Sequence, residues 1–388
     1  MGAKRLGMGL VGAGFVGPHH VDAVRRLGYV DIVAVAGSSK ASAQAKADSL
    51  HIDKAYGSYE ELLADPAVQV VHNATPNYLH HAVNAAAIAK GKHVVSDKPL
   101  AMTAAEAKSL VDLATKAGIV HAVTFNYRGN PLVQQARLAI ARGDIGAPTF
   151  LHGSYLQDWL IKPTDYSWRL EPDKGGASSA LGDIGSHWCD LAQHVSGLRI
   201  THVLGDITTT IKTRKKPTGS REAFQADGGG ATTDVDITVE DLASVLLRFD
   251  NGAKGSFSVG QVCAGHKNDL QLEICGTKAS MKWRQEEQNE LWIGHRDEPN
   301  QILQKDPSLL ERGAARYAHL PGGHQEAWAD AFCNLMRDIY GFISAGHPAS
   351  DPHRAAFATF EDGYRANCVV EAILKSAKAG GSWTKVDY

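Results

Sequence analysis

The chain has 388 residues, of which 44% are hydrophobic and 21% are charged, and its formal net charge is −2. This composition is typical of a globular protein with room for two domains and a sizeable core in each. Acidic and basic residues are interspersed, which argues against a surface for nucleic acid or anionic lipid. The one basic run, Arg214-Lys215-Lys216, lies in a polar stretch and is expected to be a solvated loop.

The five cysteines are widely spaced, odd in number and without a C-x-x-C motif. This pattern indicates reduced thiols and a cytoplasmic location. A strand is predicted from Leu6 onward, so we expect no signal peptide. We also expect no transmembrane helix, because no apolar run is long enough to span a bilayer.

The first third of the chain alternates predicted strands and helices. The helices after Ser58 and Thr103 are expected from capping boxes that these residues form with Glu61 and Glu106. Repeated alternation predicts a parallel sheet with helices on both faces. Strands are expected at 6–11, 32–36, 68–74, 93–96 and 119–125, and the other helices at 17–27 and 77–90.

After Phe125 the pattern changes to runs of strands, which predict a mostly antiparallel sheet. Asp250-Asn251-Gly252 is expected to join two of them as a hairpin turn. The stretch 217–233 is rich in glycine and polar residues and is expected to be a mobile loop. Strands are expected at 149–155, 201–213, 242–249, 255–261, 270–274 and 281–283, and helices at 131–142, 325–345 and 355–377.

Gly12-Ala13-Gly14-Phe15-Val16-Gly17 follows the first predicted strand and opens a predicted helix. In a dinucleotide site the first glycine permits a tight turn, the second lets the backbone approach the pyrophosphate, and the third lets helix and strand pack closely. The helix N-terminus then offers N–H groups to the phosphates. A tight turn that happens to contain three glycines is the alternative, but the flanking elements favour dinucleotide binding.

The predicted fold class is therefore α/β followed by α+β. Residues 1–125 are expected to form a Rossmann NAD(P)-binding domain. Residues 126–388 are expected to form a C-terminal α+β domain on a mostly antiparallel open sheet, which binds the substrate and suits assembly into a homodimer or homotetramer.

The second predicted strand ends in Ala36-Gly37-Ser38-Ser39-Lys40. An enzyme that uses NAD is expected to carry an acid here, because a carboxylate binds the ribose 2′-hydroxyl. Hydroxyls and an ammonium instead favour the 2′-phosphate of NADP(H), with NAD(H) possible. An ordinary polar turn with a solvated lysine remains the alternative.

Asp97-Lys98-Pro99 places a lysine just beyond a predicted parallel strand, at the edge where α/β sheets bind ligands. Alone, it is more often a surface lysine. Together with the glycine turn it resembles the Gfo/Idh/MocA family (glucose-fructose oxidoreductase, inositol dehydrogenase and relatives), whose motif is Glu-Lys-Pro. Ala74-Thr75-Pro76-Asn77-Tyr78-Leu79-His80, Phe125-Asn126-Tyr127-Arg128 and Trp168-Arg169 match further family segments in the same order.

Asp183, His187 and Asp190 share one face of a predicted helix, because they are four and three residues apart. A carboxylate beside an imidazole can fix its tautomer and raise its basicity. A buried histidine satisfied by a helix neighbour is one alternative. A metal site of His187, Asp190 and His194 is another, but no further ligand cluster supports it, so no metal is expected.

The family resemblance implies a set of site residues. Lys98, Asp183 and His187 are the expected catalytic residues, which converge on the substrate hydroxyl. The expected cofactor contacts are Gly12, Gly14, Phe15, Val16, Gly17, Ser38, Ser39, Lys40, Ala74, Thr75, Pro76, Asn77, His80, Asp97, Lys98, Asn126, Trp168 and Arg169. The expected substrate contacts are Lys98, Tyr127, Arg128, Tyr155, Gln157, Trp159, Asp183, His187 and His324.

The expected reaction is NAD(P)-dependent oxidation or reduction at a ring hydroxyl of a sugar, glycoside or cyclic polyol, with the nicotinamide as hydride acceptor or donor. Lys98 and His187 are expected to share the proton path. Aromatic, amide and charged residues between Tyr155 and Arg169 suit a carbohydrate, although Trp159 and Trp168 could instead be core packing. Two other classes remain possible: a hydrolase or lyase that oxidises its substrate transiently, and a non-catalytic NADP sensor.

Overall fold

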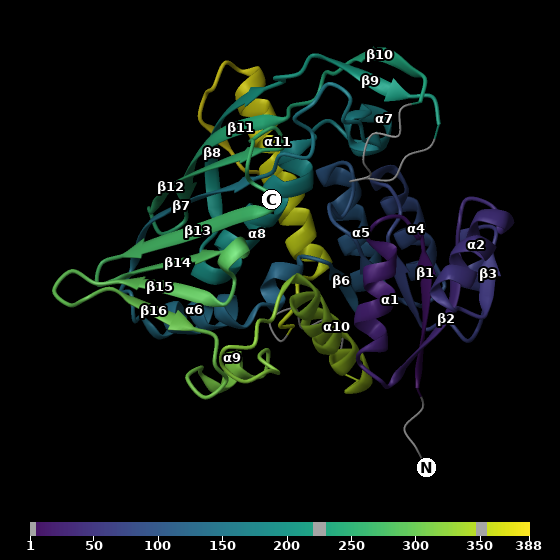
Figure 1. Cartoon of the computed structure of the whole chain (residues 1–388), viewed down its shortest axis with the longest axis horizontal. Coiled ribbons are helices and arrows are strands. Elements are labelled where there is room, and N and C mark those ends of the chain that lie inside the picture. The colour runs from purple at the N-terminus through teal and green to yellow at the C-terminus, as the bar shows by residue number, and fades with distance from the viewer. Residues whose placement is uncertain (1–4, 220–229, 347–354) are drawn as a thin grey trace. The chain divides into compact units, whose positions relative to one another are not determined.

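The chain forms two compact units in a computed structural model that describes residues 5–219, 230–346 and 355–388 (Figure 1). The first unit comprises Met1–Asn126 and Phe332–Arg365, and the second comprises Tyr127–Ala331 and Ala366–Tyr388. The sequence predicts a boundary after residue 125. The return of Phe332–Arg365 to the first unit is not part of that prediction.

The first unit holds a six-stranded sheet in which every neighbouring pair is parallel, as predicted. Its order is β3-β2-β1-β4-β5-β6, so the chain changes direction across the sheet between β1 and β4. Such a switch point is where open α/β sheets bind ligands, at the carboxyl ends of the strands. The strands are β1 (Leu6–Val11), β2 (Val30–Ala36), β3 (Lys54–Tyr56), β4 (Val70–Asn73), β5 (His93–Ser96) and β6 (His121–Val123).

Five helices connect these strands: α1 (Gly17–Arg25), α2 (Lys40–Leu50), α3 (Tyr59–Ala64), α4 (Asn77–Ala89) and α5 (Ala104–Ala117). The predicted caps are confirmed, because the hydroxyls of Ser58 and Thr103 accept the N–H groups of Glu61 and Glu106. The sequence reading missed α2 and β3. The buried residues of α2 are the alanines at 43 and 47, so this helix carries little hydrophobic periodicity.

A distant segment completes the first unit. It includes most of α10 (Trp328–Ser344) and the start of α11 (Phe360–Lys378). The Tyr340 hydroxyl lies 2.9 Å from His72 Nε2 on β4, and the N–H of Val123 on β6 donates to the Ala358 carbonyl at 2.9 Å. Both helices begin later than predicted, α10 by three residues and α11 by five.

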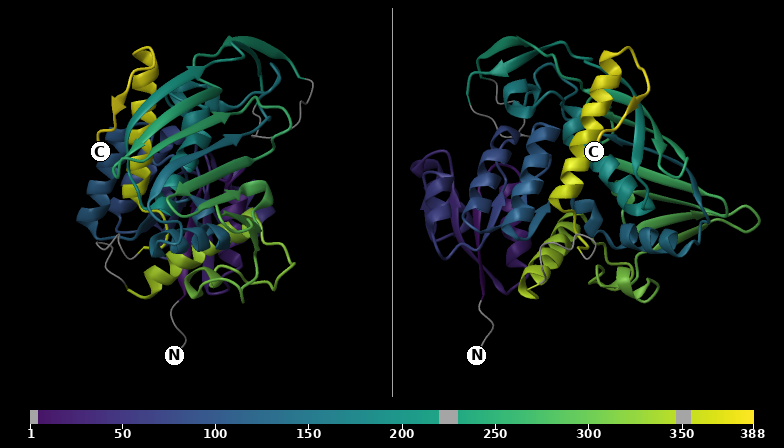
Figure 2. Two further views of the ribbon diagram at one scale, coloured as in Figure 1. Left: turned by 90° about the vertical axis from the view of Figure 1, so that its left-hand side faces the viewer. Right: turned by 180° about the vertical axis from the view of Figure 1, so that it is seen from behind.

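The second unit is built on a nine-stranded sheet whose neighbours are antiparallel except for the parallel pair β7 and β12 (Figure 2). Its order is β16-β15-β14-β13-β7-β12-β11-β8-β17. The mostly antiparallel sheet is as predicted. The strands are β7 (Pro148–Leu156), β8 (Ile200–Thr208), β11 (Leu242–Phe249), β12 (Lys254–Gly260), β13 (Asp269–Gly276), β14 (Ser280–Arg284), β15 (Glu290–Gly294), β16 (Gln301–Gln304) and β17 (Thr384–Lys385).

The predicted strand at 201–213 is wrong in its length. β8 ends at Thr208, and β9 (Thr213–Pro217) pairs with β10 (Thr232–Asp236) as a separate two-stranded sheet. The carboxylate of Asp241 accepts the N–H groups of Thr210 and Ile211 in the interval, which turns the chain. The loop predicted at 217–233 lies largely outside the described residues, and β10 occupies its described end.

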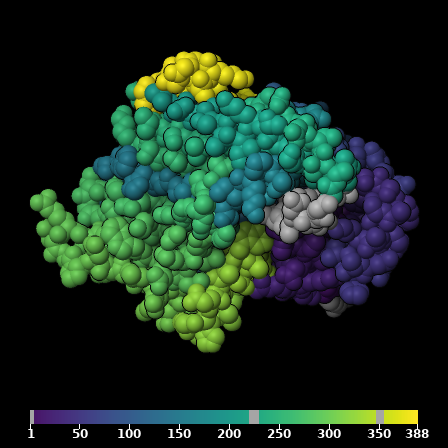
Figure 3. All heavy atoms as spheres, turned by 45° about the horizontal axis from the view of Figure 1, so that its top comes forward, coloured from purple at the N-terminus to yellow at the C-terminus, as the bar shows by residue number. Residues whose placement is uncertain are grey.

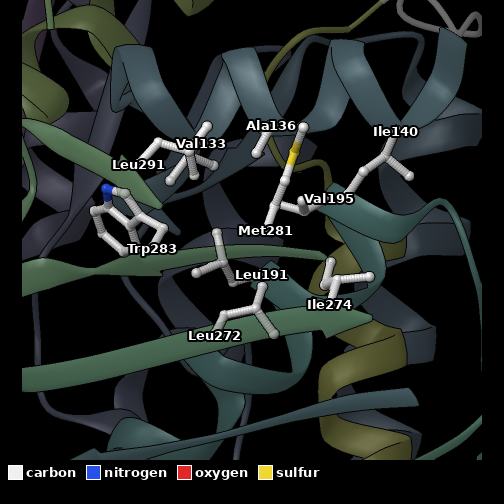
Figure 4. A pocket seen from close by; sticks show the side chains of 10 residues that line it. All are labelled: Val133, Ala136, Ile140, Leu191, Val195, Leu272, Ile274, Met281, Trp283 and Leu291. Atoms are coloured by element: carbon white, nitrogen blue, oxygen red, sulfur yellow. The ribbon is translucent and has the colours of Figure 1, made fainter. Parts of the chain in front are cut away.

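Two helices, α6 (Pro131–Arg142) and α8 (Ser186–Ser196), pack on one face of this sheet. Figure 4 shows the apolar layer between them and β13, β14 and β15. Every lining side chain is hydrophobic, so the small space there belongs to the core rather than to a polar substrate site. The lining residues are Val133, Ala136, Ile140, Leu191, Val195, Leu272, Ile274, Met281, Trp283 and Leu291.

At one edge of the sheet β17 pairs with β8. In Figure 3 the yellow atoms of the C-terminal segment lie against teal atoms of the second unit. All five cysteines lie among the described residues and are thiols. Of the helices described, none combines the length and the apolar character that a bilayer crossing needs.

Candidate active site

The glycine turn lies at the carboxyl end of β1, and its three glycines differ in what surrounds them. Gly12 has φ +84°, and a Cβ built there would lie 2.7 Å from the Ala74 carbonyl oxygen. A Cβ on Gly17 would lie 2.7 Å from the Gly12 carbonyl oxygen, whereas one on Gly14 would meet no described atom within 4 Å. The turn therefore packs tightly at both ends and is open at its centre, which fits close approach of a pyrophosphate to Gly14.

His80 links the turn after β4 to the turn after β5. It is fully buried, with Nε2 at 2.8 Å from the Thr75 carbonyl and Nδ1 at 2.7 Å from the Pro99 carbonyl. Burial lowers the pKa of His80, although Asp97 and both carbonyls oppose that shift. The residue thus holds the backbone on either side of the expected nicotinamide-binding edge.

Asp97 and Lys98 occupy the turn after β5, as predicted, and the Lys98–Pro99 peptide bond is cis. The Thr124 hydroxyl donates to Asp97 Oδ1 at 2.5 Å, and the Asp97 N–H donates to the Asn73 carbonyl at 2.8 Å. Burial opposes the charge of Asp97, yet the ammonium of Lys98 and the Thr124 hydrogen bond keep the pKa of this carboxyl below its ordinary value. Lys98 therefore projects from a backbone fixed by its acidic neighbour.

The turn after β2 carries the residues predicted to select the cofactor. The Ser39 hydroxyl caps α2 by accepting the N–H of Ser42, and Ser38 and Ser39 are exposed. The Lys40 ammonium donates to the Ala55 carbonyl and lies 5.9 Å from the centre of the Tyr56 ring. Two exposed hydroxyls and a helix N-terminus therefore lie at the end of this strand.

The remaining predicted cofactor residues of the first unit differ in exposure and in their position along the helices. Phe15 is 46% exposed, Val16 precedes α1, and Pro76 and Asn77 begin α4. Asn126 is 3% exposed, and its Nδ2 is buried without a hydrogen-bond partner among the described residues. A buried donor of this kind is available to a bound molecule, which is consistent with the cofactor contact predicted for Asn126.

In the second unit, Asp183 and His187 do not lie on one regular α-helix, so that prediction is wrong. Leu181–Gly185 forms a π-helical turn, in which the Ser186 N–H bonds to the Leu181 carbonyl five residues back, and α8 follows. The turn changes the angular spacing between the two side chains, because it holds more residues than an α-turn. Such turns are frequent at functional sites.

Both oxygens of Asp183 accept hydrogen bonds. Arg169 Nε donates to Oδ1 at 3.2 Å, and Gln261 Nε2 donates to Oδ2 at 2.8 Å. The Arg169 guanidinium lies 4.6 Å from the centre of the Trp168 ring, and its Nη1 is buried without a partner among the described residues. Trp168 and Arg169, predicted from the family pattern, thus lie beside Asp183.

His187 is 7% exposed and lies against two tyrosines. Its ring centre is 5.1 Å from that of Tyr127 and 6.2 Å from that of Tyr155, with the rings edge to face. Burial raises the pKa of Tyr127 to about 12 and that of Tyr155 well above its ordinary value. Both phenols therefore keep their protons at neutral pH and can donate hydrogen bonds.

Asn268, which the sequence reading missed, joins the predicted substrate residues into one network. Its Oδ1 accepts from the Tyr155 hydroxyl at 2.6 Å and from Gln157 Nε2 at 2.8 Å, and its Nδ2 donates to the Tyr127 hydroxyl at 3.1 Å. Trp159 Nε1 donates to Gln157 Oε1 at 2.8 Å. Four predicted substrate residues are thus brought together by an asparagine more than 100 positions further along the chain.

Trp159 also packs against a small buried cluster that includes Leu160 and Leu170. The indole is therefore part of the local core as well as of the polar network. The core-packing alternative is thus met in part, because the ring is partly buried, while its N–H donates to Gln157.

Arg128 and Asp190 face each other rather than open space. Arg128 Nε donates to Asp190 Oδ2 at 2.9 Å, and Nη2 donates to the other oxygen. His194 Nε2 lies 3.2 Å from Gln134 Nε2. Asp190 thus accepts a bidentate arginine, which a shared metal site with His187 and His194 would have to displace.

Two further placements concern His324 and metal binding. His324 is exposed, with Nδ1 at 3.3 Å from the Gly322 carbonyl, and it lies four positions before Trp328, where α10 begins. Within the described residues, the group able to hold a metal ion is His152, Glu273 and Cys275 on β7 and β13, which are none of the predicted site residues.

Comparison with known proteins adds an independent line of evidence. Residues 6–125 match the oxidoreductase family with an NAD-binding Rossmann fold, and residues 133–282 match the GFO/IDH/MocA C-terminal domain. Levoglucosan dehydrogenase of Pseudarthrobacter phenanthrenivorans is 30% identical over 99% of this chain and 98% of its own length. The 1,5-anhydro-D-fructose reductase of Ensifer adhaerens is 35% identical over 96% of each chain. The solved structure of levoglucosan dehydrogenase with NADH and levoglucosan has a TM-score of 0.88 at 28% identity, covering 99% of this chain and 100% of that one.

Proposed function

Because the chain belongs to the Gfo/Idh/MocA family of oxidoreductases, we propose that it moves a hydride between nicotinamide and a ring hydroxyl of a sugar, glycoside or cyclic polyol. One observation carries this proposal. Within the first unit, the open glycine turn after β1 and Lys98 after β5 both lie at the carboxyl edge of the parallel sheet. A nicotinamide bound along that edge supplies the hydride acceptor or donor.

The proton path follows from the side chains that can carry it. Oxidation of a secondary alcohol needs a base for the O–H proton. We assign that role to Lys98 and His187 together. Asp183 fixes the imidazole orientation, and its own carboxylate is held by Arg169 and Gln261.

The substrate class is supported by the network around Asn268. Phenols, amides and an indole offer donors and acceptors together with apolar ring faces, which suits a pyranose. Levoglucosan, an anhydro sugar, and 1,5-anhydro-D-fructose appear in the names of two relatives that span nearly the whole chain. Anhydro sugars are therefore the first substrates to test.

For the cofactor we propose a preference for NADP(H), with NAD(H) also bound. The support is the exposed pair Ser38 and Ser39 at the N-terminus of α2, where an acid that binds the 2′-hydroxyl of NAD is expected. A helix N-terminus offers backbone N–H groups that stabilise a phosphate, and the exposed Ser38 hydroxyl lies beside it. The names of several related structures include NADH or NAD+, so the preference needs a direct measurement.

We also propose that the protein is a cytoplasmic homo-oligomer that uses the outer face of its nine-stranded sheet. The five thiols suit a reducing compartment. Phe150, Leu246 and Ile302 on this sheet are 38%, 47% and 60% exposed. Light scattering of Leu246→Asp, which places a charge among these side chains, tests the surface, and an unchanged mass contradicts it.

The deciding experiment is a panel of anhydro sugars, free sugars, glycosides and inositols, each assayed with NAD and NADP by absorbance of the reduced cofactor. Net reduced cofactor with a cyclic sugar or polyol is the expected result. A hydrolase or lyase that oxidises its substrate transiently gives product without net reduced cofactor. Activity confined to short-chain hydroxy acids or amino acids would overturn the proposed substrate class.

A further inference from the structure

Gln261 is a buried residue beside Asp183 that the predicted set does not contain. It follows β12 directly, and its exposed fraction is 0%. Its backbone is held on both sides, because its N–H donates to the Asp241 carbonyl at 2.9 Å and its carbonyl accepts from the Leu160 N–H at 3.1 Å. The Cα atom from which the Gln261 side chain extends is therefore held in place.

The orientation of the Gln261 amide is set by its partners. A carboxylate accepts but does not donate, so the amide nitrogen faces Asp183 Oδ2, at 2.8 Å. The amide oxygen then accepts from the Ser179 hydroxyl at 3.4 Å. Because both ends of the amide are hydrogen-bonded, the Gln261 side chain is held in the orientation that points Nε2 at Asp183.

The two donors to Asp183 differ in charge. Arg169 brings a positive charge to Oδ1, which stabilises the carboxylate but competes with an imidazolium for it. Gln261 brings a neutral donor to Oδ2, which orients the carboxylate without such competition. The Gln261 amide is therefore suited to orienting the Asp183 carboxylate, and the Arg169 guanidinium is suited to keeping that carboxylate ionised.

The same turn is held from a second point. Glu240 is 2% exposed, and its Oε1 accepts the N–H groups of Ser179 and Leu181, each at 2.9 Å, while its backbone carbonyl accepts that of Ala180 at 3.2 Å. Three successive N–H groups at the start of the π-helical turn are thus bound by one residue, in place of an ordinary N-cap. Glu240 and Gln261 together fix the turn and the carboxylate that it carries.

We propose that Gln261 is a positioning residue for the proposed reaction, which fixes the direction of the Asp183 carboxylate. That Asp183 in turn orients the imidazole of His187 is part of the proposed function. This inference rests on the proposed function, because the orientation matters only if His187 handles the proton of the substrate. The charged or titratable groups that the described contacts place near Asp183 or its turn include Arg169, Glu240, Asp241 and the neutral phenols of Tyr127 and Tyr155.

The first test is Gln261→Met, which keeps the volume and removes the donor. We expect kcat to fall about 10- to 100-fold, the scale of a lost hydrogen bond to a charged group. The KM for the sugar and the Kd for the cofactor should stay within about threefold, because a positioning residue affects the reacting groups and not binding. Gln271→Met is the matched control, since Gln271 on β13 donates to Asp269 at 3.0 Å in the same sheet.

The second test reads His187 directly and without cofactor or substrate. The imidazole is followed by NMR of the full chain carrying ¹³C-labelled histidine, with His187→Gln for assignment. Gln261→Glu places a second carboxyl beside Asp183, and at pH values where both carboxyls are ionised the added negative charge should move the midpoint of the His187 titration to higher pH. Gln271→Glu should leave that midpoint where it is in the wild type.

The possible outcomes distinguish the positioning role of Gln261 from the proposed function of the protein. An unchanged kcat in Gln261→Met, or an unmoved His187 midpoint in Gln261→Glu, overturns the positioning role. If the Met variant does not fold, as judged by its melting transition, the titration of the Glu variant decides. A wild type that reduces neither cofactor with any sugar, but whose His187 midpoint still moves in Gln261→Glu, would contradict the proposed function while showing that residue 261 and His187 are coupled.

Discussion

The two units build their functional residues in different ways. In the first unit, the candidate cofactor residues come from short contiguous turns, and backbone geometry at Gly12 and Gly14 does most of the positioning. In the second unit, side chains from distant segments meet, as when Asn268 joins Tyr127 to Tyr155. Backbone sites can be recognised from local sequence, whereas side-chain networks depend on tertiary packing. The predictions below test whether this contrast holds in function.

The largest effect is expected at Lys98, where a single side chain carries chemistry in the otherwise backbone-built unit. Lys98→Ala should lower kcat by about 10²–10⁴-fold and leave cofactor affinity nearly unchanged, as expected for loss of an acid–base group. Lys98→Arg keeps the charge but cannot act as a base near neutral pH, so it should be equally impaired. Steady-state kinetics and a cofactor titration measure both. Activity of the Arg variant near the wild-type level would limit Lys98 to a binding role.

A substitution at Asn268 tests whether the hydrogen-bond network of the second unit contributes to sugar binding. Asn268→Ala removes the shared partner of two phenols and one amide, so kcat/KM for the sugar should fall about 10- to 100-fold, with KM as the main contributor. The cofactor Kd should not change. Asn300→Ala is the control, because Asn300 bonds within the β15–β16 connection, at the His295 N–H. If the two variants have equal kcat/KM, the network is not part of sugar binding.

Gly12 and Gly14 test how far backbone geometry positions the cofactor in the first unit. Gly12→Ala places a Cβ 2.7 Å from the Ala74 carbonyl at a positive φ, so it should destabilise the fold by about 1–3 kcal/mol. Gly14→Ala meets no described atom within 4 Å, so the protein should fold normally and bind cofactor about tenfold more weakly. Melting curves and cofactor titrations separate the two effects. Unchanged affinity in Gly14→Ala would show that the cofactor does not approach this turn.

A smaller effect is expected at the end of β2. Ser39→Asp supplies a carboxylate for a ribose hydroxyl and repels a 2′-phosphate, so the ratio of kcat/KM for NADP to that for NAD should fall by about tenfold, roughly 1.4 kcal/mol. Aspartate also caps helices, so α2 should stay intact. Wild-type efficiency that is equal or higher with NAD would contradict the proposed preference.

The smallest effect concerns stability and pH. Burial raises the pKa of Glu240 to about 7, against the opposing hydrogen bonds of Leu181 and Ser179. Between its ordinary pKa of 4.5 and about 7, the folded protein holds a proton that the unfolded chain releases, so this group makes the free energy of unfolding fall as pH rises. Glu240→Gln should remove that dependence and gain stability relative to the wild type by about 1–3 kcal/mol towards pH 8. Urea unfolding from pH 5 to 8 measures it, with the exposed Glu290→Gln as control. A wild-type curve with the opposite slope in that window, unchanged in Glu240→Gln, would contradict this assignment.

The sequence predicts features that are local. The parallel sheet, the glycine turn and the helix caps at Ser58 and Thr103 are confirmed, because each depends on residues within a few positions of one another. The π-helical turn at Leu181–Gly185 has no periodicity of its own to read, and the predicted regular helix was wrong there. Gln261 lies 78 positions from Asp183, and no spacing rule links an amide to a carboxylate at that distance.

The connection between β12 and β13 has a consequence for how this protein can change over evolution or in the laboratory. Gln261 at its start contacts Asp183, and Asn268 at its end contacts the tyrosine pair, so under the proposed function its two ends belong to proton handling and to sugar binding. Its middle is tied to the same region, since the Cys263 N–H donates to the Gln157 carbonyl at 2.8 Å. Substitutions along this connection are therefore expected to be epistatic. Transplanting the whole connection from a relative with another substrate should retain more activity than exchanging its residues one at a time.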